Sequence, residues 1–199
     1  MNMGAGLELL LSGVIGYLLG AVPTGVIICR LLRGVDLRQT GSGHTGGTNV
    51  LRIAGFWAGA ATALIDVLLG SAAVALAAHL FENPWAPTTA GVLAVIGHNW
   101  SIFIHFGGGI GLSSLAGALL WTWPLDTLIS IALLILFWLI LVRLLHIHRA
   151  RATVATMVVT APLLWAVGLP NHGILLGVLA GGIVILKTLP DWNRLYATE

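Results

Sequence analysis

The chain has 199 residues, of which 58% are hydrophobic and only 8% are charged. Soluble domains carry about 25% charged residues, so this composition excludes a soluble enzyme, a disordered tail and a coiled coil. The formal net charge of +2 is small, and no basic run alternates with aromatic residues as in nucleic-acid-binding proteins. The composition predicts an all-α, polytopic integral membrane protein with one membrane-embedded domain over residues 1–199, in contact with the lipid bilayer and not with nucleic acid.

Seven apolar segments approach the length needed to cross a bilayer, which is about 20 helical residues. They are Leu7–Cys29, Ile53–Leu80, Thr88–Ile104, Gly111–Trp123, Thr127–Leu145, Thr153–Gly168 and Gly173–Leu189. Each span must be helical, because lipid offers the backbone no hydrogen-bond partners. Gly111–Trp123 is short for a full span, and a re-entrant segment is the alternative there.

The positions of the basic residues orient the chain. With the N-terminus outside and seven crossings, every Lys and Arg residue falls on one side, within 30–52, 143–152 and 187–199. The opposite loops, around Glu82, Asp126 and Asn171, hold none. By the positive-inside rule the basic side is cytoplasmic, so we expect the C-terminus in the cytoplasm.

The longest polar stretch, residues 33–52, contains the run Gly41-Ser42-Gly43-His44-Thr45-Gly46-Gly47-Thr48-Asn49. Glycines allow backbone N–H groups to converge on an anion, and the Ser and Thr hydroxyl groups add donors. Arg52 follows near the start of a predicted helix, where the helix dipole also favours an anion. This pattern predicts a phosphate site, and a flexible polar loop is the alternative.

A second glycine-rich run, Gly107-Gly108-Gly109-Ile110-Gly111, follows the third apolar segment and leads directly into the next predicted helix. It is a second candidate anion site, and His98 and His105 precede it. Close helix packing through small residues is the competing explanation of these glycines.

Two other features could carry function. Asp66 lies inside the second apolar segment, and ionisable groups at membrane depth are costly and usually functional; a helix cap near the interface is the alternative. The basic cluster 143–151, which includes Arg149, is explained most simply by contact with anionic lipid.

Three motifs in this order, with this spacing, resemble a known family. They are Gly16-Tyr17-Leu18-Leu19-Gly20-Ala21-Val22-Pro23-Thr24-Gly25, the loop from Gly41 to Arg52, and Gly97-His98 with Phe103 and the run from Phe106 to Gly111. The chain resembles the bacterial acyl-phosphate:glycerol-3-phosphate acyltransferases, the PlsY family. The resemblance implies a seven-helix enzyme with cytoplasmic motif loops in the bacterial inner (plasma) membrane.

The implied reaction moves a fatty acyl group from acyl phosphate to the 1-hydroxyl of glycerol 3-phosphate. The product is lysophosphatidic acid, for phospholipid biosynthesis, and neither a cofactor nor a metal is implied. We expect catalytic roles for Ser42, Asn49, Arg52 and His98. We expect substrate binding by Gly41, Gly43, Thr48, Asp66, Gly107, Gly108, Gly109, Gly111 and Arg149.

The chain departs from the family pattern in its charged and polar positions. His44 replaces an asparagine, Leu69 and Ile110 replace lysines, and Thr188 and Asp191 stand where the family carries a histidine and an asparagine. Candidate replacement cations on the same side are Arg38, Arg149 and Arg151.

Two alternatives to an active acyltransferase therefore remain open. The first is a catalytically inactive paralogue that binds a phosphorylated lipid precursor or partners another acyltransferase. The second is a small membrane transporter or channel, suggested by Asp66 and the number of spans.

Overall fold

The computed structural model of the protein describes residues 4–194, which are almost entirely helical and contain no strand beyond an isolated bridge between Ser101 and Gly107. The α-helices are α1 (Ala5–Gly20), α2 (Thr24–Arg33), α3 (Gly47–Ala54), α4 (Phe56–Leu80), α5 (Ala86–Asn99), α6 (Leu112–Thr122), α7 (Pro124–Leu139), α8 (Arg149–Val167) and α9 (Asn171–Thr188). A π-helical turn, Ile140–Leu144, extends α7. Short 3-10 turns cover Leu37–Gln39, Ile102–Ile104 and Leu189–Asp191. The chain is thus all-α, as expected from its composition.

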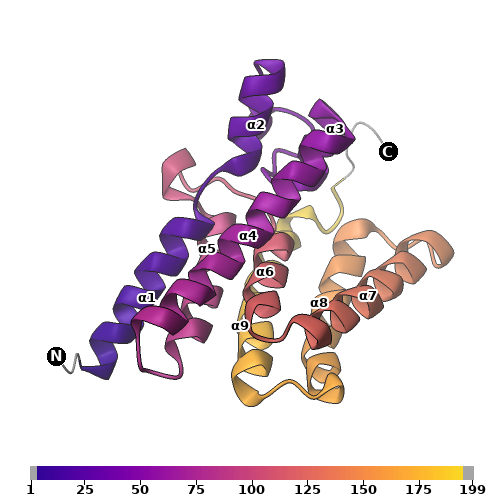
Figure 1. The fold of residues 1–199 in the computed structure, drawn as a ribbon. Helices are drawn as coiled ribbons and strands as arrows, with labels where there is room; N and C mark the ends of the chain where they lie inside the picture. The colour runs from indigo at the N-terminus through magenta and orange to yellow at the C-terminus, as the bar shows by residue number, and fades with distance from the viewer. Residues whose placement is uncertain (1–3, 195–199) are drawn as a thin grey trace.

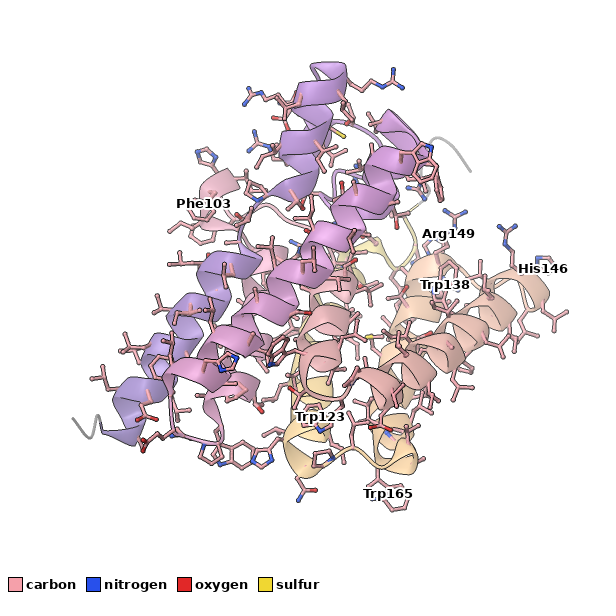
Figure 2. The ribbon with its side chains drawn as sticks, in the orientation of Figure 1. Phe103, Trp123, Trp138, His146, Arg149 and Trp165 are labelled. Atoms are coloured by element: carbon pink, nitrogen blue, oxygen red, sulfur yellow. The ribbon has the colours of Figure 1, made fainter. Side chains whose placement is uncertain are left out.

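The helices form a bundle whose two ends differ (Figure 1). One end, at the top of Figure 1, carries α2, α3, the loops 34–46 and 100–111, and the segment 189–194. We call it the basic end, because Arg30, Arg33, Arg38, Arg52 and Arg194 lie on these elements, and Lys187 lies in the last turn of α9, directly before the segment 189–194. The opposite end carries the turns 81–85 and 168–170. In Figure 2, Arg149 and His146 lie toward the basic end, and Trp123 and Trp165 lie toward the other.

Small residues allow the central helices to pack closely. A Cβ atom added at Gly16 or Gly20 of α1 would lie about 2 Å from a carbonyl oxygen of α5 (Ala90 or Ala94). Gly70 of α4 and Gly117 of α6 show the same close approach to each other's helix. Such contacts are typical of helices in membranes, where close packing replaces the hydrophobic drive of water. The large apolar side chains that remain exposed, such as Leu128 and Ile129 of α7, suit a lipid surface.

Within residues 4–194, five helical segments are long and apolar enough to cross a membrane. They are Ala5–Arg33, Phe56–Leu80, Pro124–Leu144, Arg149–Val167 and Asn171–Asp191. Helix α6 is apolar but has only 11 residues, and α5 has 14. The protein is therefore a multi-pass membrane protein, in which the two short helices lie among the longer ones.

Three of the predicted segments differ from the observed helices. Leu7–Cys29 is divided into α1 and α2, because Pro23 has no N–H to continue the helix and restricts the residue before it. Ile53–Leu80 is interrupted at Gly55, whose φ of 93° separates α3 from α4. Thr88–Ile104 ends as a helix at Asn99, and the residues that follow belong to the second glycine loop.

Candidate active site

The first glycine loop, residues 41–46, is held in place by the side chain of Asn49. The Asn49 carbonyl Oδ1 accepts the Ser42 N–H at 3.1 Å, and Nδ2 donates to the carbonyls of Thr40 (3.0 Å) and His44 (2.9 Å). Gly41 has φ +59°, and an added Cβ would lie 2.2 Å from Asn49 Oδ1. The buried amide therefore fixes the loop from inside, and the loop leads directly into α3.

The second glycine loop, residues 107–111, is folded against the end of α5. The Gly109 N–H donates to the His98 carbonyl at 3.0 Å. Added Cβ atoms would meet the Asn99 carbonyl oxygen at 2.3 Å from Gly108, and His98 Nε2 at 2.1 Å from Gly109. These two positions need glycine for close packing on His98 and Asn99, and Gly111 caps the start of α6 with φ +92°.

The two glycine loops touch each other. The Thr45 N–H of the first loop donates to the Gly108 carbonyl of the second at 3.3 Å. Arg38, just before the first loop, reaches the Ile104 carbonyl near the second loop (3.5 Å) and pairs with Asp36 at 2.6 Å. Loops separated by more than 50 residues in the sequence thus form one surface at the basic end of the bundle.

A buried polar pair lies next to this surface. The Asp66 carboxylate on α4 accepts a hydrogen bond from the Thr24 hydroxyl at the start of α2, and both side chains are buried. The Nδ1 atom of His98 lies 3.9 Å from Asp66 Oδ1. The other oxygen, Asp66 Oδ2, has no hydrogen-bond partner among the described residues. Asp66 thus lies inside α4, away from its ends, between the Thr24 hydroxyl and the His98 ring.

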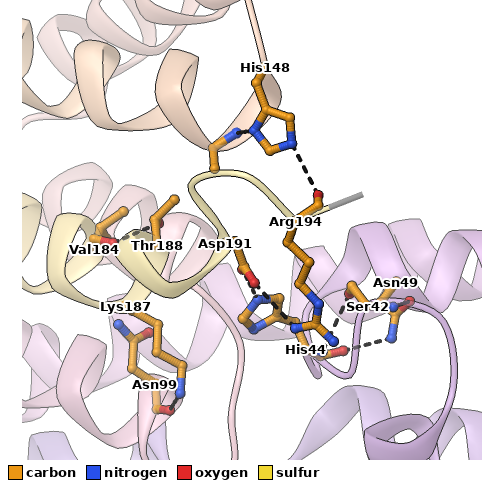
Figure 3. Close-up of polar contacts among 11 residues, drawn as sticks. Ser42, His44, Asn49, Asn99, His148, Val184, Lys187, Thr188, Asp191 and Arg194 are labelled. Carbon is orange, nitrogen blue, oxygen red and sulfur yellow. Dashed lines mark hydrogen bonds and ion pairs between the residues drawn. The ribbon is translucent and has the colours of Figure 1, made fainter. Parts of the chain in front are cut away.

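The C-terminal segment completes the site, as Figure 3 shows. Asp191 Oδ2 lies 2.5 Å from His44 Nε2 of the first loop, and Asp191 Oδ1 lies 3.2 Å from Arg194. Lys187 Nζ donates to the Asn99 carbonyl at 2.6 Å, beside the second loop. In the sequence this segment stands out as one of the basic stretches and as a departure from the family pattern. The run Lys187–Asp191 at the end of the last apolar span was the available signal.

The structure brings most of the expected residues together and places others at the margin. Ser42, Asn49, His98, Gly108 and Gly109 lie in the two touching loops or directly beneath them. Of the others, Thr48 is exposed on the first turn of α3, with Arg52 one turn later. Arg149 is exposed at the start of α8, outside the two loops.

A groove lies between α3, α4 and α6, and Gly47, the residue after the first loop, is part of its lining. It encloses about 260 Å³. Its lining includes the hydroxyl residues Thr48 and Ser113 together with Gly47, Leu51, Phe56, Gly59, Ala60 and Ala63. The groove therefore places hydroxyl groups and apolar walls side by side.

Comparison with known proteins identifies the family and the fold. A family model described as glycerol-3-phosphate acyltransferase matches residues 10–198. The chain belongs to this acyltransferase family. A glycerol-3-phosphate acyltransferase of Synechococcus sp. (strain JA-3-3Ab) is 41% identical over 186 residues, covering 92% of this chain and 87% of the relative. One from Rippkaea orientalis is 35% identical over 193 residues, covering 92% and 87%.

A solved structure has the same fold. It is the crystal structure of PlsY (YgiH), an integral membrane glycerol 3-phosphate acyltransferase, in its glycerol 3-phosphate form. It is 29% identical in sequence, with a TM-score of 0.79, and the match covers 94% of this chain and 90% of that one. The resemblance inferred from the three motifs is therefore confirmed at the level of family and fold.

The departures from the family pattern now have positions in the acyltransferase fold. Ile110 packs against the apolar core between α5, α6 and α9. The Thr188 hydroxyl is buried and donates to the Val184 carbonyl of its own helix at 2.7 Å. His44 and Asp191, two of the substituted positions, contact each other.

Two of the expected replacement cations are engaged elsewhere. The Arg38 guanidinium pairs with Asp36. Arg151 bonds to Asn193 and lies 5.6 Å from the centre of the Trp192 ring. Lys187 is a further cation beside the second loop, where its ammonium group donates to the Asn99 carbonyl on which Gly108 packs.

Proposed function

We propose that the protein transfers a fatty acyl group from acyl phosphate to the 1-hydroxyl of glycerol 3-phosphate, giving lysophosphatidic acid and phosphate. The observation that carries this proposal is the contact between Thr45 and Gly108. It joins the two candidate phosphate loops into one surface, on which two phosphorylated substrates can lie in contact.

The two substrates together bring about four negative charges near neutral pH, since the second phosphate ionisation lies near pH 6. Arg52 and the first loop bind one phosphate, and Ser42 and Thr48 contribute hydroxyl donors. The second loop and the start of α6 bind the other phosphate or the developing oxyanion, because N–H groups converge at a helix N-terminus.

The transfer needs no covalent acyl-enzyme. The 1-hydroxyl oxygen attacks the acyl carbonyl carbon, which is activated as a mixed anhydride. The new ester C–O bond forms, and the bond between the carbonyl carbon and the phosphate oxygen breaks. The hydroxyl proton ends on the departing phosphate, so charge and atoms balance. The contribution of the site is to hold both reactants at reacting distance and to stabilise negative charge.

The buried pair gives His98 and Asp66 distinct roles in this proposal. His98 lies directly under Gly109 and orients groups at the reaction centre or carries a proton. Asp66, fixed by Thr24, holds the imidazole in position. Asn49 acts by fixing the backbone of the first loop, since its amide is occupied by loop contacts.

The acyl chain lies in the groove along α3, α4 and α6, with its phosphate end toward Thr48 and Ser113. The apolar walls of the groove suit a fatty tail entering from the bilayer. We place the basic end in the cytoplasm of a bacterial cell, with seven crossings of the plasma membrane that include the short helices α5 and α6. The positive-inside rule supports this orientation.

One observation favours a second function. The second loop carries no cation of its own. It has Ile110, which packs against the apolar core. A protein that binds a phosphorylated lipid precursor without turnover would tolerate this loss. This alternative predicts substrate binding without phosphate release.

The test uses the purified full-length protein in lipid nanodiscs, supplied with acyl phosphate and glycerol 3-phosphate. The wild type is expected to release phosphate and form lysophosphatidic acid. Arg52→Ala is expected to lower the rate by about a hundredfold or more, the cost of one lost electrostatic contact of about 3 kcal/mol. Arg33→Met, an exposed cation of α2, is the control. Absence of release above a no-protein control in several lipids would overturn the proposal.

A further inference from the structure

We propose that Lys187 is the cation that binds the phosphate group of the acyl donor beside the second glycine loop. The inference rests on the proposed function, since it names a further residue of the same site. Three observations support it. The Lys187 ammonium group lies beside the second loop, it has N–H donors left for a ligand, and the neighbouring charged groups already contact other partners.

The ammonium group lies next to the second loop. Lys187 Nζ donates to the Asn99 carbonyl oxygen at 2.6 Å. The same oxygen is the atom on which Gly108 packs so closely that an added Cβ would lie 2.3 Å from it. Gly108 is also the residue that accepts the N–H of Thr45. Lys187 therefore lies one contact away from the point where the two glycine loops meet.

The ammonium group also has capacity left for a ligand. A lysine carries three N–H donors, and within residues 4–194 the hydrogen bond to Asn99 is the one that Nζ makes. Its side chain is half-buried and lies 5.0 Å from the centre of the Trp100 ring. Lysine binds phosphate as a point charge, and a partly desolvated charge acts more strongly on a bound anion than one in water.

The neighbouring charges leave this role to Lys187. Asp191 acts electrostatically on Lys187, but its carboxylate is already in contact with His44 and Arg194. Arg38 pairs with Asp36 at the edge of the loops. Ile110 supplies no charge to the second loop. Lys187 instead places its ammonium group against the Asn99 carbonyl, the group on which Gly108 packs.

A purely structural role is the competing explanation. Lys187 lies in the last turn of α9 and bonds the last residue of α5, and cations near helix C-termini stabilise helices. A cap of this kind predicts a loss of stability without a selective effect on phosphate binding. The two roles can therefore be separated by kinetics.

The experiment compares Lys187→Met, Lys187→Gln and Lys187→Arg with the wild type in nanodiscs. Glutamine keeps a donor for the Asn99 carbonyl and removes the charge. Lys187→Met and Lys187→Gln are expected to raise the KM for acyl phosphate by about tenfold or more, with the KM for glycerol 3-phosphate changed by less than about twofold. Inhibition by inorganic phosphate, competitive with acyl phosphate, should weaken by the same factor. Lys187→Arg should recover most of the wild-type value, and Arg33→Met should match the wild type.

A second-site variant sharpens the test. Ile110→Lys, introduced into Lys187→Gln, is expected to restore a low KM for acyl phosphate by returning a cation to the loop. The proposal is overturned if Lys187→Gln lowers only the unfolding temperature and leaves both KM values and phosphate inhibition unchanged.

A wild type without turnover would refute the proposed function and leave Lys187 testable by binding. In that case inorganic phosphate should raise the unfolding temperature of the wild type and of Lys187→Arg, and not that of Lys187→Gln. Equal stabilisation of the wild type and Lys187→Gln by phosphate would overturn the role of Lys187.

Discussion

His44 of the first glycine loop and Asp191 of the C-terminal segment lie 2.5 Å apart, Nε2 to Oδ2, although 147 residues separate them in the sequence. Both side chains are largely buried, with 17% and 5% of their surface exposed. Both also stand at positions where the family pattern carries asparagine. Two substitutions that look independent in the sequence therefore form one contact, which ties the first loop to the end of α9.

The first prediction concerns this pair. His44→Asn and Asp191→Asn are each expected to destabilise the protein, because each removes one side of a mostly buried contact. The double variant should cost less than the sum of the two, with a coupling free energy of about 0.5–3 kcal/mol. Equilibrium unfolding in detergent measures all four corners of the cycle. Strict additivity would show that the contact contributes nothing to stability.

The second prediction concerns Gly41 and its matched control Gly46. Gly41→Ala places a methyl group against Asn49 in a left-handed backbone conformation, whereas a Cβ at Gly46 meets nothing within 4 Å. Gly41→Ala should lower the unfolding free energy by about 1–3 kcal/mol and reduce turnover, because the Ser42 hydroxyl shifts with the loop. Gly46→Ala should leave the unfolding free energy near that of the wild type. Equal effects at the two positions would contradict the role assigned to Asn49.

The third prediction tests His98 through the glycine above it. Gly109→Ala is expected to displace the imidazole, because the added methyl would meet Nε2 at 2.1 Å. Turnover should fall about tenfold or more, as expected when a positioned group is misplaced by about 1 Å. Gly182→Ala, where an added Cβ meets nothing within 4 Å, is the steric control.

A double variant shows whether Gly109 acts through His98. Combining Gly109→Ala with His98→Ala should reduce turnover no further than His98→Ala alone. An additional loss in the double variant would mean that Gly109 supports the reaction by another route.

The fourth prediction concerns pH. Hydrogen bonds from Arg38 lower the pKa of Asp36 to about 2 from its ordinary value of 3.8. Since the folded state favours the carboxylate, the pair stabilises the protein above about pH 4 and loses this contribution as the pH falls toward 2. The difference in unfolding temperature between the wild type and Asp36→Asn should therefore be largest near neutral pH and shrink in acid. A difference that does not depend on pH would contradict the role of the ion pair.

Much of the protein could be predicted from local sequence. Apolar length and charge placement predicted a multi-pass helical protein, since a spanning helix satisfies its own backbone and needs only its own residues to be apolar. The glycine runs predicted two special loops, and their motifs predicted the family. Segment ends were less accurate, because Pro23 and Gly55 interrupt runs that remain apolar on both sides.

The tertiary structure alone decided which polar groups meet. The contacts between Thr45 and Gly108, His44 and Asp191, and Lys187 and Asn99 join segments from different helices. Arg38 and Arg151 carry the right charge for a substrate but are held by Asp36 and by the C-terminal segment. The local sequence sets where polar residues stand and which backbone conformation they adopt. Their partners depend on helix packing, and small residues such as Gly16 and Gly70 set how closely the helices approach.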